Sequence, residues 1–326
     1  MGQFELIPTF PAVICCENLP LSIYTHIEGR DFMDWLTRMN AALAYVENNL
    51  TDEIDHKRLA QIACCSSHNF YKMFSYVADV SLAEYVRRRR LTLAALELQN
   101  SGVKVIDLAL KYGYDSPVSF SRAFHGLHGV TPTQARADGV TLKAYPKISF
   151  QMTIKGEKEM DYRIETKEAF QFFGFEEIFK LDESGRKPCD MWEQFNSDGT
   201  CEKLEHDAGF LPEFVGKDLH KVHSICSYRE TDEDSFPYLI GAFRDKSSLV
   251  EGYTIVDVPT NTWAIFPSEK FKWDDIDEVI GSLYKRVFTE WLPMSDYEQV
   301  GGLGLELYGG TDELGYIELW LAVTKK

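Results

Sequence analysis

Several features that define other classes of protein are missing from this sequence of 326 residues. It has no run of 18 or more apolar residues, which excludes a membrane-spanning helix. Its first residues do not combine a basic stretch with an apolar core, so no secretory signal is expected. Its seven cysteines form no CxxC or Cys/His spacing, so the sequence predicts neither a metal site nor a bound cofactor. We therefore expect a cytoplasmic protein with free thiols and no membrane partner.

Positive charge is scarce as well. The chain holds 34 Lys and Arg against 51 Asp and Glu, a formal net charge of −17. A protein that binds nucleic acid usually carries the opposite balance. The acidic excess is uneven, however, because residues 35–140 contain 12 Lys and Arg against 10 Asp and Glu. The length suggests two domains, and the charge separates a nearly neutral N-terminal part from an acidic C-terminal part.

The N-terminal part contains a repeated helical pattern between residues 54 and 136. It predicts a helix at 56–63 with a turn at 64–65, and again a helix at 104–112 with a turn at 113–115, each turn being followed by a second helix. This is the plan of two helix-turn-helix units, in which the second helix enters the DNA major groove. Two units at a fixed offset predict a protein that reads two neighbouring groove segments.

Residues at the helix ends support these units. Ser66 and Ser116 are good N-caps for the second helices, Pro117 falls at a first helical position, and Gly113 can adopt the left-handed conformation that ends a helix. A capping box of Ser81 and Glu84 opens the connecting helix. A helix of about 18 residues is roughly 27 Å long, which is close to the ~34 Å between successive major grooves on one DNA face.

This part of the chain resembles the DNA-binding domain of AraC-type (AraC/XylS) transcription regulators over residues 35–137. The similarity is carried by the runs ALKYGYDS at 109–116, FSRAF at 120–124 and GVTP at 129–132. One departure is Cys64, where the family usually has glycine. The resemblance implies an all-α double helix-turn-helix domain, which we place at residues 33–138, after an extension at 1–32 that we expect to be flexible.

The candidate DNA contacts lie at the start of the two reading helices, where side chains can reach base edges. An asparagine can read adenine, and an arginine can reach guanine or a phosphate. Within the run Arg87–Arg90 the four side chains point in different directions; the resemblance implies a structural role for Arg90, whereas Arg87 and Arg89 are expected to contact phosphates. The candidate DNA-binding residues are Ser67, His68, Asn69, Tyr71, Lys72, Arg87, Arg89, Val118, Ser119, Ser121 and Arg122.

After residue 139 the pattern changes from helical to predominantly strand. Between the strands the sequence predicts a short helix near 188–196 and a long amphipathic helix over 274–291. The order is strand–strand–helix–strand–strand, once over roughly 160–245 and again over 252–324, after a linker or first strand at 139–159. The expected strands are 148–154, 161–166, 170–175, 222–229, 239–244, 253–258, 262–266, 303–308 and 316–323.

The C-terminal part resembles the GyrI-like effector-binding domain that certain AraC-type regulators carry, over about residues 155–326. The similarity is carried by TWAIF at 262–266, WLP at 291–293 and IELW at 317–320. The implied fold class is an all-α double helix-turn-helix domain followed by a duplicated α+β domain at 160–326. In that family the pocket lies between the two copies and binds small lipophilic, often cationic, molecules.

By this resemblance Glu318 is the acid of the pocket. It interrupts an otherwise apolar strand, where an unpaired carboxylate is costly, and Trp320, two residues on, shares its strand face. Glu306 and Tyr308 repeat this relation on the expected neighbouring strand. An aromatic wall suits a cationic ligand because ring faces attract cations. Further candidate ligand contacts are Trp192, Phe195, Tyr228, Trp263 and Phe266.

We therefore expect a transcription regulator that binds double-stranded DNA and a small-molecule effector. Ligand binding would alter the docking of the two domains or the contact with RNA polymerase. One alternative is a GyrI-like hydrolase attached to a DNA-binding domain, with Glu318 as base; since no Ser/His/Asp or Cys/His arrangement supplies a nucleophile, we expect no enzyme. Another alternative is an architectural or protein-inhibiting module that takes no small ligand.

Overall fold

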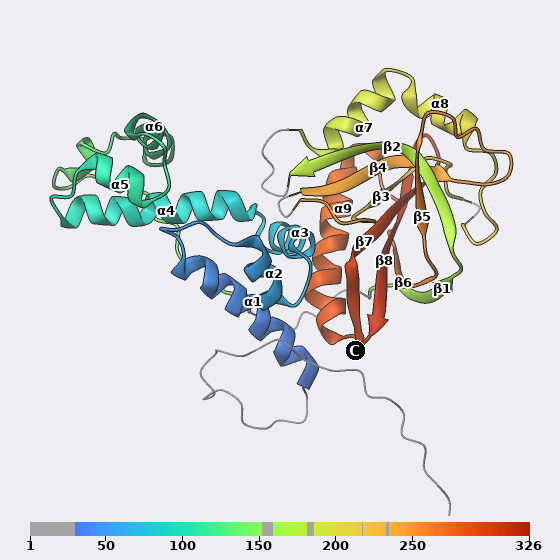
Figure 1. The fold of residues 1–326 in the computed structure, drawn as a ribbon, viewed down its shortest axis with the longest axis horizontal. Coiled ribbons are helices and arrows are strands. Elements are labelled where there is room, and N and C mark those ends of the chain that lie inside the picture. The colour runs from blue at the N-terminus through green and yellow to red at the C-terminus, as the bar shows by residue number, and fades with distance from the viewer. Residues whose placement is uncertain (1–29, 152–158, 181–185, 217, 233–234) are drawn as a thin grey trace, which may run out of the picture.

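The computed structural model describes residues 30–151, 159–180, 186–216, 218–232 and 235–326. A helical part and a sheet part lie side by side along the long axis of the molecule (Figure 1). The expected flexible extension at 1–32 falls outside the described residues except for its last three, which begin the first helix, α1.

The helical part contains both expected helix-turn-helix units. Each second helix begins as the sequence predicts, because the Ser66 hydroxyl accepts from the Asn69 amide and the Ser116 hydroxyl accepts from the Ser119 amide. Its helices are α1 (Arg30–Asn48), α2 (His56–Ala63), α3 (Ser67–Ala78), α4 (Leu82–Asn100), α5 (Val105–Lys111) and α6 (Pro117–His128), followed by a 3₁₀ turn at Gln134–Arg136.

The sheet part is one antiparallel sheet in the order β1-β6-β8-β7-β3-β4-β2-β5. The order is symmetric about the β3–β7 pair. If each of β1 to β4 is exchanged with its counterpart among β5 to β8, the same order is obtained when read from the other edge of the sheet. This confirms the expected duplication of a strand–strand–helix–strand–strand unit. Its strands are β1 (Arg163–Lys167), β2 (Phe170–Lys180), β3 (His223–Cys226), β4 (Ser235–Phe243), β5 (Thr254–Val258), β6 (Asn261–Pro267), β7 (Tyr297–Gly310) and β8 (Gly315–Lys325).

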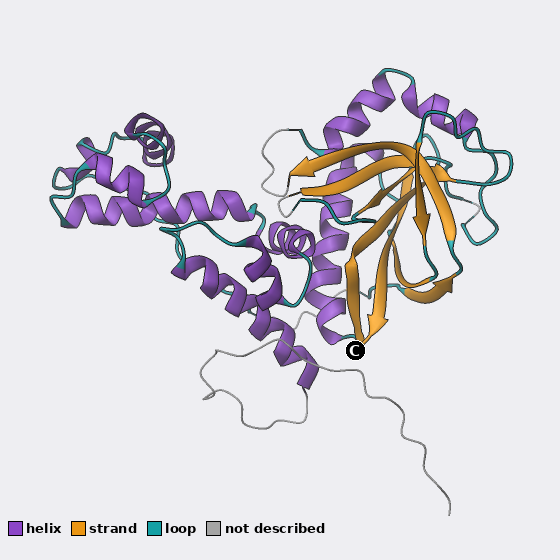
Figure 2. Ribbon diagram, viewed as in Figure 1, coloured by secondary structure: helices purple, strands orange, loops and turns teal. Residues whose placement is uncertain are grey.

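Helices α7 (Pro188–Ser197) and α9 (Ile276–Arg286) occupy equivalent places in the two copies (Figure 2). Two expectations need correction. The described part of the expected strand at 148–154 forms no strand; instead Phe150 packs between the two parts and its backbone bonds to Asn40. The expected helix at 274–291 starts with a 3₁₀ turn and ends in a π turn, Val287–Trp291. A short helix, α8 (Thr200–Asp207), has no counterpart in the sequence prediction.

The first helix-turn-helix unit shares a hydrophobic core with the sheet part. Phe70 and Phe74 of this unit belong to the same buried cluster as Tyr284, Phe288 and Leu319. The second unit, by contrast, has its own core around Phe120 and Phe124. Burial of apolar surface is the main driving force of packing, so this shared core holds the first unit against the sheet part. The second unit projects away from the sheet part (Figure 1).

Candidate functional site

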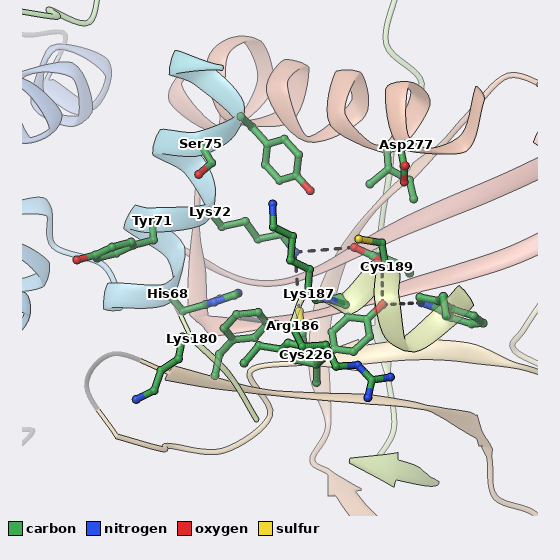
Figure 3. Close-up of a pocket in the computed structure, with 18 of the residues that line it drawn as sticks. His68, Tyr71, Lys72, Ser75, Lys180, Arg186, Lys187, Cys189, Cys226 and Asp277 are labelled. Atoms are coloured by element: carbon green, nitrogen blue, oxygen red, sulfur yellow. Dashed lines mark hydrogen bonds and ion pairs between the residues drawn. The ribbon is translucent and has the colours of Figure 1, made fainter. Parts of the chain in front are cut away.

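A cavity of about 340 Å³ lies where the first helix-turn-helix unit meets the centre of the sheet. Helix α3 forms one wall, and the start of α7, helix α9 and strands β2, β3, β4 and β7 form the others (Figure 3). We call this space the central cavity. Its lining residues are His68, Tyr71, Lys72, Ser75, Tyr76, Phe179, Lys180, Arg186, Lys187, Pro188, Cys189, Trp192, Cys226, Phe236, Tyr238, Asp277, Ile280, Glu306 and Tyr308.

The floor of the cavity is set by the symmetric centre of the sheet. Strands β3 and β7 pair there, with Ser224 opposite Glu306. Side chains alternate between the two faces of a strand, so Glu306 and Tyr308 project from the same face. Leu305 and Leu307 project from the other face, into a separate hydrophobic core.

Glu306 is held by a ring of hydroxyl donors. Its Oε1 accepts from Tyr284 at 2.8 Å, and its Oε2 accepts from Tyr308 at 2.9 Å and from Ser224 at 3.1 Å. The side chain is only 12% exposed. Hydroxyl donors on both oxygens hold the carboxylate in one orientation in the floor of the cavity.

A cation from the helical part lies beside this carboxylate. Lys72 Nζ on α3 lies 3.9 Å from Glu306 Oε1, donates to the Tyr284 hydroxyl at 2.7 Å and sits 4.0 Å from the centre of the Tyr284 ring. The Lys72 side chain is 18% exposed. The combination of a carboxylate and a ring face is one that binds cations generally, and here a lysine occupies it.

Aromatic side chains surround the charged pair. Trp192 donates from its indole to the Tyr238 hydroxyl at 2.9 Å and packs edge-on against Tyr308 at 5.0 Å. Burial, with Glu306 close by, raises the pKa of Tyr238, Tyr284 and Tyr308 well above the usual value. These phenols stay protonated at neutral pH and remain hydrogen-bond donors to Glu306.

His68 is a buried polar group in the cavity wall with unused hydrogen-bonding capacity. Neither ring nitrogen has a hydrogen-bond partner, and the ring packs 4.2 Å from that of Phe236. Burial, and then the nearby Lys72, lowers the pKa of His68 well below its usual value. A buried polar atom without a partner is uncommon, and His68 has two of them.

The mouth of the cavity carries basic side chains. Lys180, Arg186 and Lys187 are exposed there, and Arg186 lies 3.6 Å from Glu177. Exposed charges act through water and mobile ions and therefore interact weakly. The inner cavity therefore holds the Lys72–Glu306 pair, and the exposed basic side chains influence its entrance.

Glu318, the expected pocket acid, does not line the central cavity. Glu306 pairs with Leu319 across β7 and β8, so Glu318 projects from the opposite face of the sheet. There it accepts from Arg163 at 2.7 Å, from the Trp320 indole at 2.9 Å and from Tyr316 at 3.0 Å. The expectation that Glu318 and Glu306 share one pocket is wrong, because Glu306 stands opposite Leu319 and not opposite a residue on the Glu318 face of β8.

The other candidate ligand residues divide in the same way. Trp192, Glu306 and Tyr308 line the central cavity. Trp320 and Trp263 are buried on the opposite face of the sheet. The remaining three also lie outside the cavity lining: Phe195 in the core under α7, Tyr228 beside Glu176, and Phe266 in the core shared with α3.

Sequence reasoning missed Tyr284, Tyr238 and Cys226 as parts of the site. Tyr284 is the one fully buried residue of α9, and a tyrosine on the apolar side of that amphipathic helix was a usable signal. Lys72 was assigned to DNA alone, since nothing in the sequence places α3 against the sheet.

The candidate DNA contacts of the first unit are covered. His68, Asn69 and Tyr71 are buried, Lys72 points into the central cavity, and the Ser67 hydroxyl bonds to the His56 carbonyl. Asn69 faces a bulge of β7, where its Oδ1 lies 3.0 Å from the place a Cβ on Gly302 would occupy. The expectation that these side chains face DNA does not hold in this arrangement, because β7 and α9 occupy that side of α3.

The candidates of the second unit are accessible. Val118 is 62% exposed, Ser119 and Arg122 are exposed, and Ser121 is half-buried. The start of α6 is therefore open to a DNA groove.

The arginine run on α4 behaves differently at each position. Arg89 forms a two-point ion pair with Glu47 and also donates to the Tyr145 carbonyl, so its expected phosphate contact is wrong. Arg90 is structural as expected, because it donates to the backbone carbonyls of Leu50 and Asp52. Arg87 pairs with Glu84 on the surface and keeps a side chain that is 42% exposed.

Within the described ranges, no group of three or more His, Cys, Asp or Glu is arranged to hold a metal ion. In the same part of the chain no helix is both long and apolar enough to cross a membrane.

Comparison with known proteins divides the chain as the fold does. Residues 59–138 match a family model described as a helix-turn-helix domain, and residues 163–323 match one described as integron-associated effector binding protein. The HTH-type transcriptional activator AarP of Providencia stuartii is 37% identical over 94 residues, covering 29% of this chain and 70% of its own length. The Transposon Tn10 TetD protein of Escherichia coli is 37% identical over 120 residues, covering 37% and 86%. Regulatory protein SoxS of Escherichia coli (strain K12) is 31% identical over 94 residues, covering 29% and 88%.

Two solved structures align with about half of the chain at low identity. One is SAV2435 bound to tetraphenylphosphonium, with a TM-score of 0.39, 15% identity and coverage of 51% of this chain and 94% of that one. The other is an integron cassette protein from the mobile metagenome of Vibrio cholerae, with a TM-score of 0.34, 14% identity and coverage of 50% and 95%.

Proposed function

The chain belongs to the AraC-type family of DNA-binding transcription regulators, with a GyrI-like effector-binding domain after its helix-turn-helix domain, and we propose that its effector is a small lipophilic cation bound in the central cavity. The observation that carries this proposal is Glu306, a buried carboxylate in the floor of an aromatic cavity. A cation entering this cavity would exchange its hydration shell for ring faces and a fixed negative charge.

The geometry of Glu306 supports a receptor for charge in particular. Hydroxyls of Tyr284, Tyr308 and Ser224, with that of Tyr238 at 3.5 Å, already orient the carboxylate, so it need not reorganise when a ligand arrives. Preorganisation of this kind reduces the entropy that binding costs. The apolar sides of Phe179, Phe236 and Trp192 would then bury the lipophilic part of the ligand.

DNA recognition would involve both helix-turn-helix units. Helix α6 presents Arg122 and Ser119 to solvent and is the accessible reading helix. We propose that a bound effector changes how α3 docks on the sheet part, and so changes the DNA contacts or the contact with RNA polymerase. The relatives AarP and SoxS are transcription regulators, which fits this reading.

The test compares ligands that differ only in charge. Benzyltrimethylammonium and its neutral isostere neopentylbenzene have the same shape, and phenylacetate serves as an anion of similar size. Calorimetry on the full chain should show binding of the cation in preference to the other two. Recovery of the cation unchanged after incubation would distinguish a receptor from a hydrolase. Tighter binding of phenylacetate would show that the basic mouth, and not Glu306, selects the ligand.

Two carboxylates on opposite faces of the sheet provide a matched pair of variants. Glu306→Gln keeps the shape of the side chain and removes its charge. It should therefore weaken binding of the cation by about 1–3 kcal/mol, or roughly 5- to 150-fold in affinity. Glu318→Gln makes the same change outside the cavity and should leave the affinity for the cation unaltered. Equal losses in both variants would refute the assignment of Glu306.

A further inference from the structure

The cation position of the central cavity is already occupied by a side chain of the DNA-binding domain. Lys72 Nζ contacts the Glu306 carboxylate, the Tyr284 hydroxyl and the Tyr284 ring, three groups to which a ligand's cation would bind. In Figure 3 Lys72 extends from α3 into the space between the helix and the sheet. The ammonium group therefore has the contacts expected of an effector's charged group.

The same contact lies on the face of the first reading helix that carries candidate DNA contacts. His68, Tyr71, Lys72 and Ser75 lie on one side of α3, and all four line the central cavity. In a helix-turn-helix, residues at the start of the second helix are those that reach base edges. A single face of α3 is thus shared between two partners, and it can serve only one of them at a time.

We propose that Lys72 is an internal competitor for the effector site: its ammonium group holds α3 against Glu306, and a cationic effector that displaces it makes the first reading helix available to DNA. This proposal rests on the proposed function, since it takes Glu306 as the effector's acid. It adds the group with which the effector competes, and it names α3 as the element whose docking the effector controls.

Electrostatics makes the two occupants mutually exclusive. Two cations within about 4 Å of one buried carboxylate repel each other at an effective dielectric constant far below that of water. If Lys72 leaves without a replacement, Glu306 becomes an uncompensated buried charge, which is strongly unfavourable. A ligand cation removes that penalty, so binding of the ligand favours the arrangement in which Lys72 is outside the cavity.

The remaining contacts of α3 fit a local change and not a separation of the two parts. Tyr76 stacks on Tyr284 at 4.7 Å, and Asp79 pairs with Lys285 at 2.7 Å. The apolar core around Phe70 and Phe74 would keep the first unit attached. Because DNA and the effector favour the same rearranged form, each should increase the affinity for the other by the same factor.

The first experiment measures competition in the full chain. Lys72→Met removes the ammonium group and preserves the length of the side chain. It should bind benzyltrimethylammonium at least ten-fold more tightly than the wild type by calorimetry, whereas neopentylbenzene should change by less than two-fold. Lys111→Met removes the same charge from a surface pair with Glu97 in the second unit and should leave both affinities unchanged.

The second experiment needs no ligand. Hydrogen exchange of the α3 amides should become at least ten-fold faster in Lys72→Met and also in Glu306→Gln, because both remove the same contact. The double variant should exchange no faster than the faster single variant, and the α6 amides should be unaffected. In the wild type, benzyltrimethylammonium should reproduce the effect on α3.

The outcomes separate the two proposals. Unchanged or weaker binding of the cation by Lys72→Met, or unchanged exchange of α3 in both single variants, overturns the role of Lys72. If the cation binds neither to the wild type nor to Lys72→Met, the proposed effector class is wrong, and so is the proposed competition with Lys72. The exchange of α3 then still decides whether the Lys72–Glu306 contact holds the helix.

Discussion

Glu306 and Glu318 lie on adjacent strands of one sheet, yet their carboxylates project from opposite faces because Glu306 pairs with Leu319. Their partners differ accordingly. Glu306 is surrounded by hydroxyls and by a lysine from another part of the chain, whereas Glu318 bonds to Arg163 on the edge strand β1. The cation beside Glu306 comes from the helical part, whereas the cation beside Glu318 comes from a strand of the same sheet.

This difference predicts a stability effect of Glu318→Gln. The variant loses the ion pair with Arg163 and weakens the hydrogen bond from the Trp320 indole. We expect a loss of about 1–3 kcal/mol, the usual value for a hydrogen bond that involves a charged group. Urea denaturation of the full chain measures it. Glu165→Gln, at a side chain that is 36% exposed, should cost under about 1 kcal/mol, and an equal cost in both variants would contradict a structural role for Glu318.

A second prediction concerns the β7 bulge under α3. Gly301 and Gly302 both have positive φ, at 58° and 95°. A Cβ on Gly302 would lie 3.0 Å from Asn69 Oδ1 and 3.2 Å from Ser66 Oγ, whereas a Cβ on Gly301 would meet nothing within 4 Å. Gly302→Ala should therefore loosen the start of α3, with faster hydrogen exchange there.

Gly301→Ala is the matched control for that variant. It introduces a side chain at positive φ as well, at a cost of roughly 1–2 kcal/mol, but it does not touch α3. Its effect should be confined to β7 and to overall stability. Faster exchange of α3 in both variants would mean that the bulge acts through the sheet and not through contact with Asn69.

The turn of the first helix-turn-helix unit provides a third prediction. Cys64 adopts the left-handed conformation, with φ 51° and ψ 43°, in a position where glycine avoids a steric penalty. Cys64→Gly should stabilise the full chain by up to about 1 kcal/mol, the left-handed penalty less the entropy that glycine loses on folding. Cys64→Ala keeps the penalty and should change little. Thermal denaturation under reducing conditions compares the two, and a destabilised glycine variant would show that the thiol itself contributes.

DNA binding by the ligand-free protein gives a fourth prediction. Arg122 on α6 is exposed, whereas Asn69 on α3 is buried against β7. On a site selected from random DNA by the full chain, Arg122→Ala should weaken specific binding by about 1–3 kcal/mol. Asn69→Ala should have little effect until a cationic effector is added. Fluorescence anisotropy at several salt concentrations measures both, and an equal loss in the two variants without effector would contradict the covering of α3.

The sequence predicted the local structure well and the relation between the parts poorly. The helix ends at Ser66, Ser81 and Ser116 depend on hydrogen bonds within four residues, which a sequence pattern can reveal. The register that separates Glu306 from Glu318 depends on pairing across β7 and β8, and alternation along each strand does not fix which residue stands opposite which.

The packing of α3 against the sheet part could not be predicted from the sequence. Residues at the start of a reading helix are polar whether they meet DNA or a protein surface, so Lys72 carries no sign of its partner. Only the three-dimensional arrangement shows that it reaches Glu306 and Tyr284. Burial of His68 was equally hidden, because its neighbour Phe236 comes from the other part of the chain.

The buried state of His68 predicts how stability depends on pH. Burial lowers the pKa of His68 well below the usual 6.5, with Lys72 adding to the effect, so the folded protein leaves this ring neutral while the unfolded chain binds a proton below pH 6.5. Stability must therefore fall as the pH falls through that value, by up to about 1.4 kcal/mol per pH unit for each such histidine. His68→Phe retains a ring beside Phe236. Between pH 7.5 and pH 5 its free energy of unfolding should fall by about 2 kcal/mol less than that of the wild type. His223, whose pKa burial lowers to about 3, keeps its own contribution in the variant, so part of the acid sensitivity should remain. Urea titrations at the two pH values measure the difference, and an unchanged acid sensitivity in His68→Phe would show that the ring becomes protonated in the folded protein, with α3 no longer packed against the sheet.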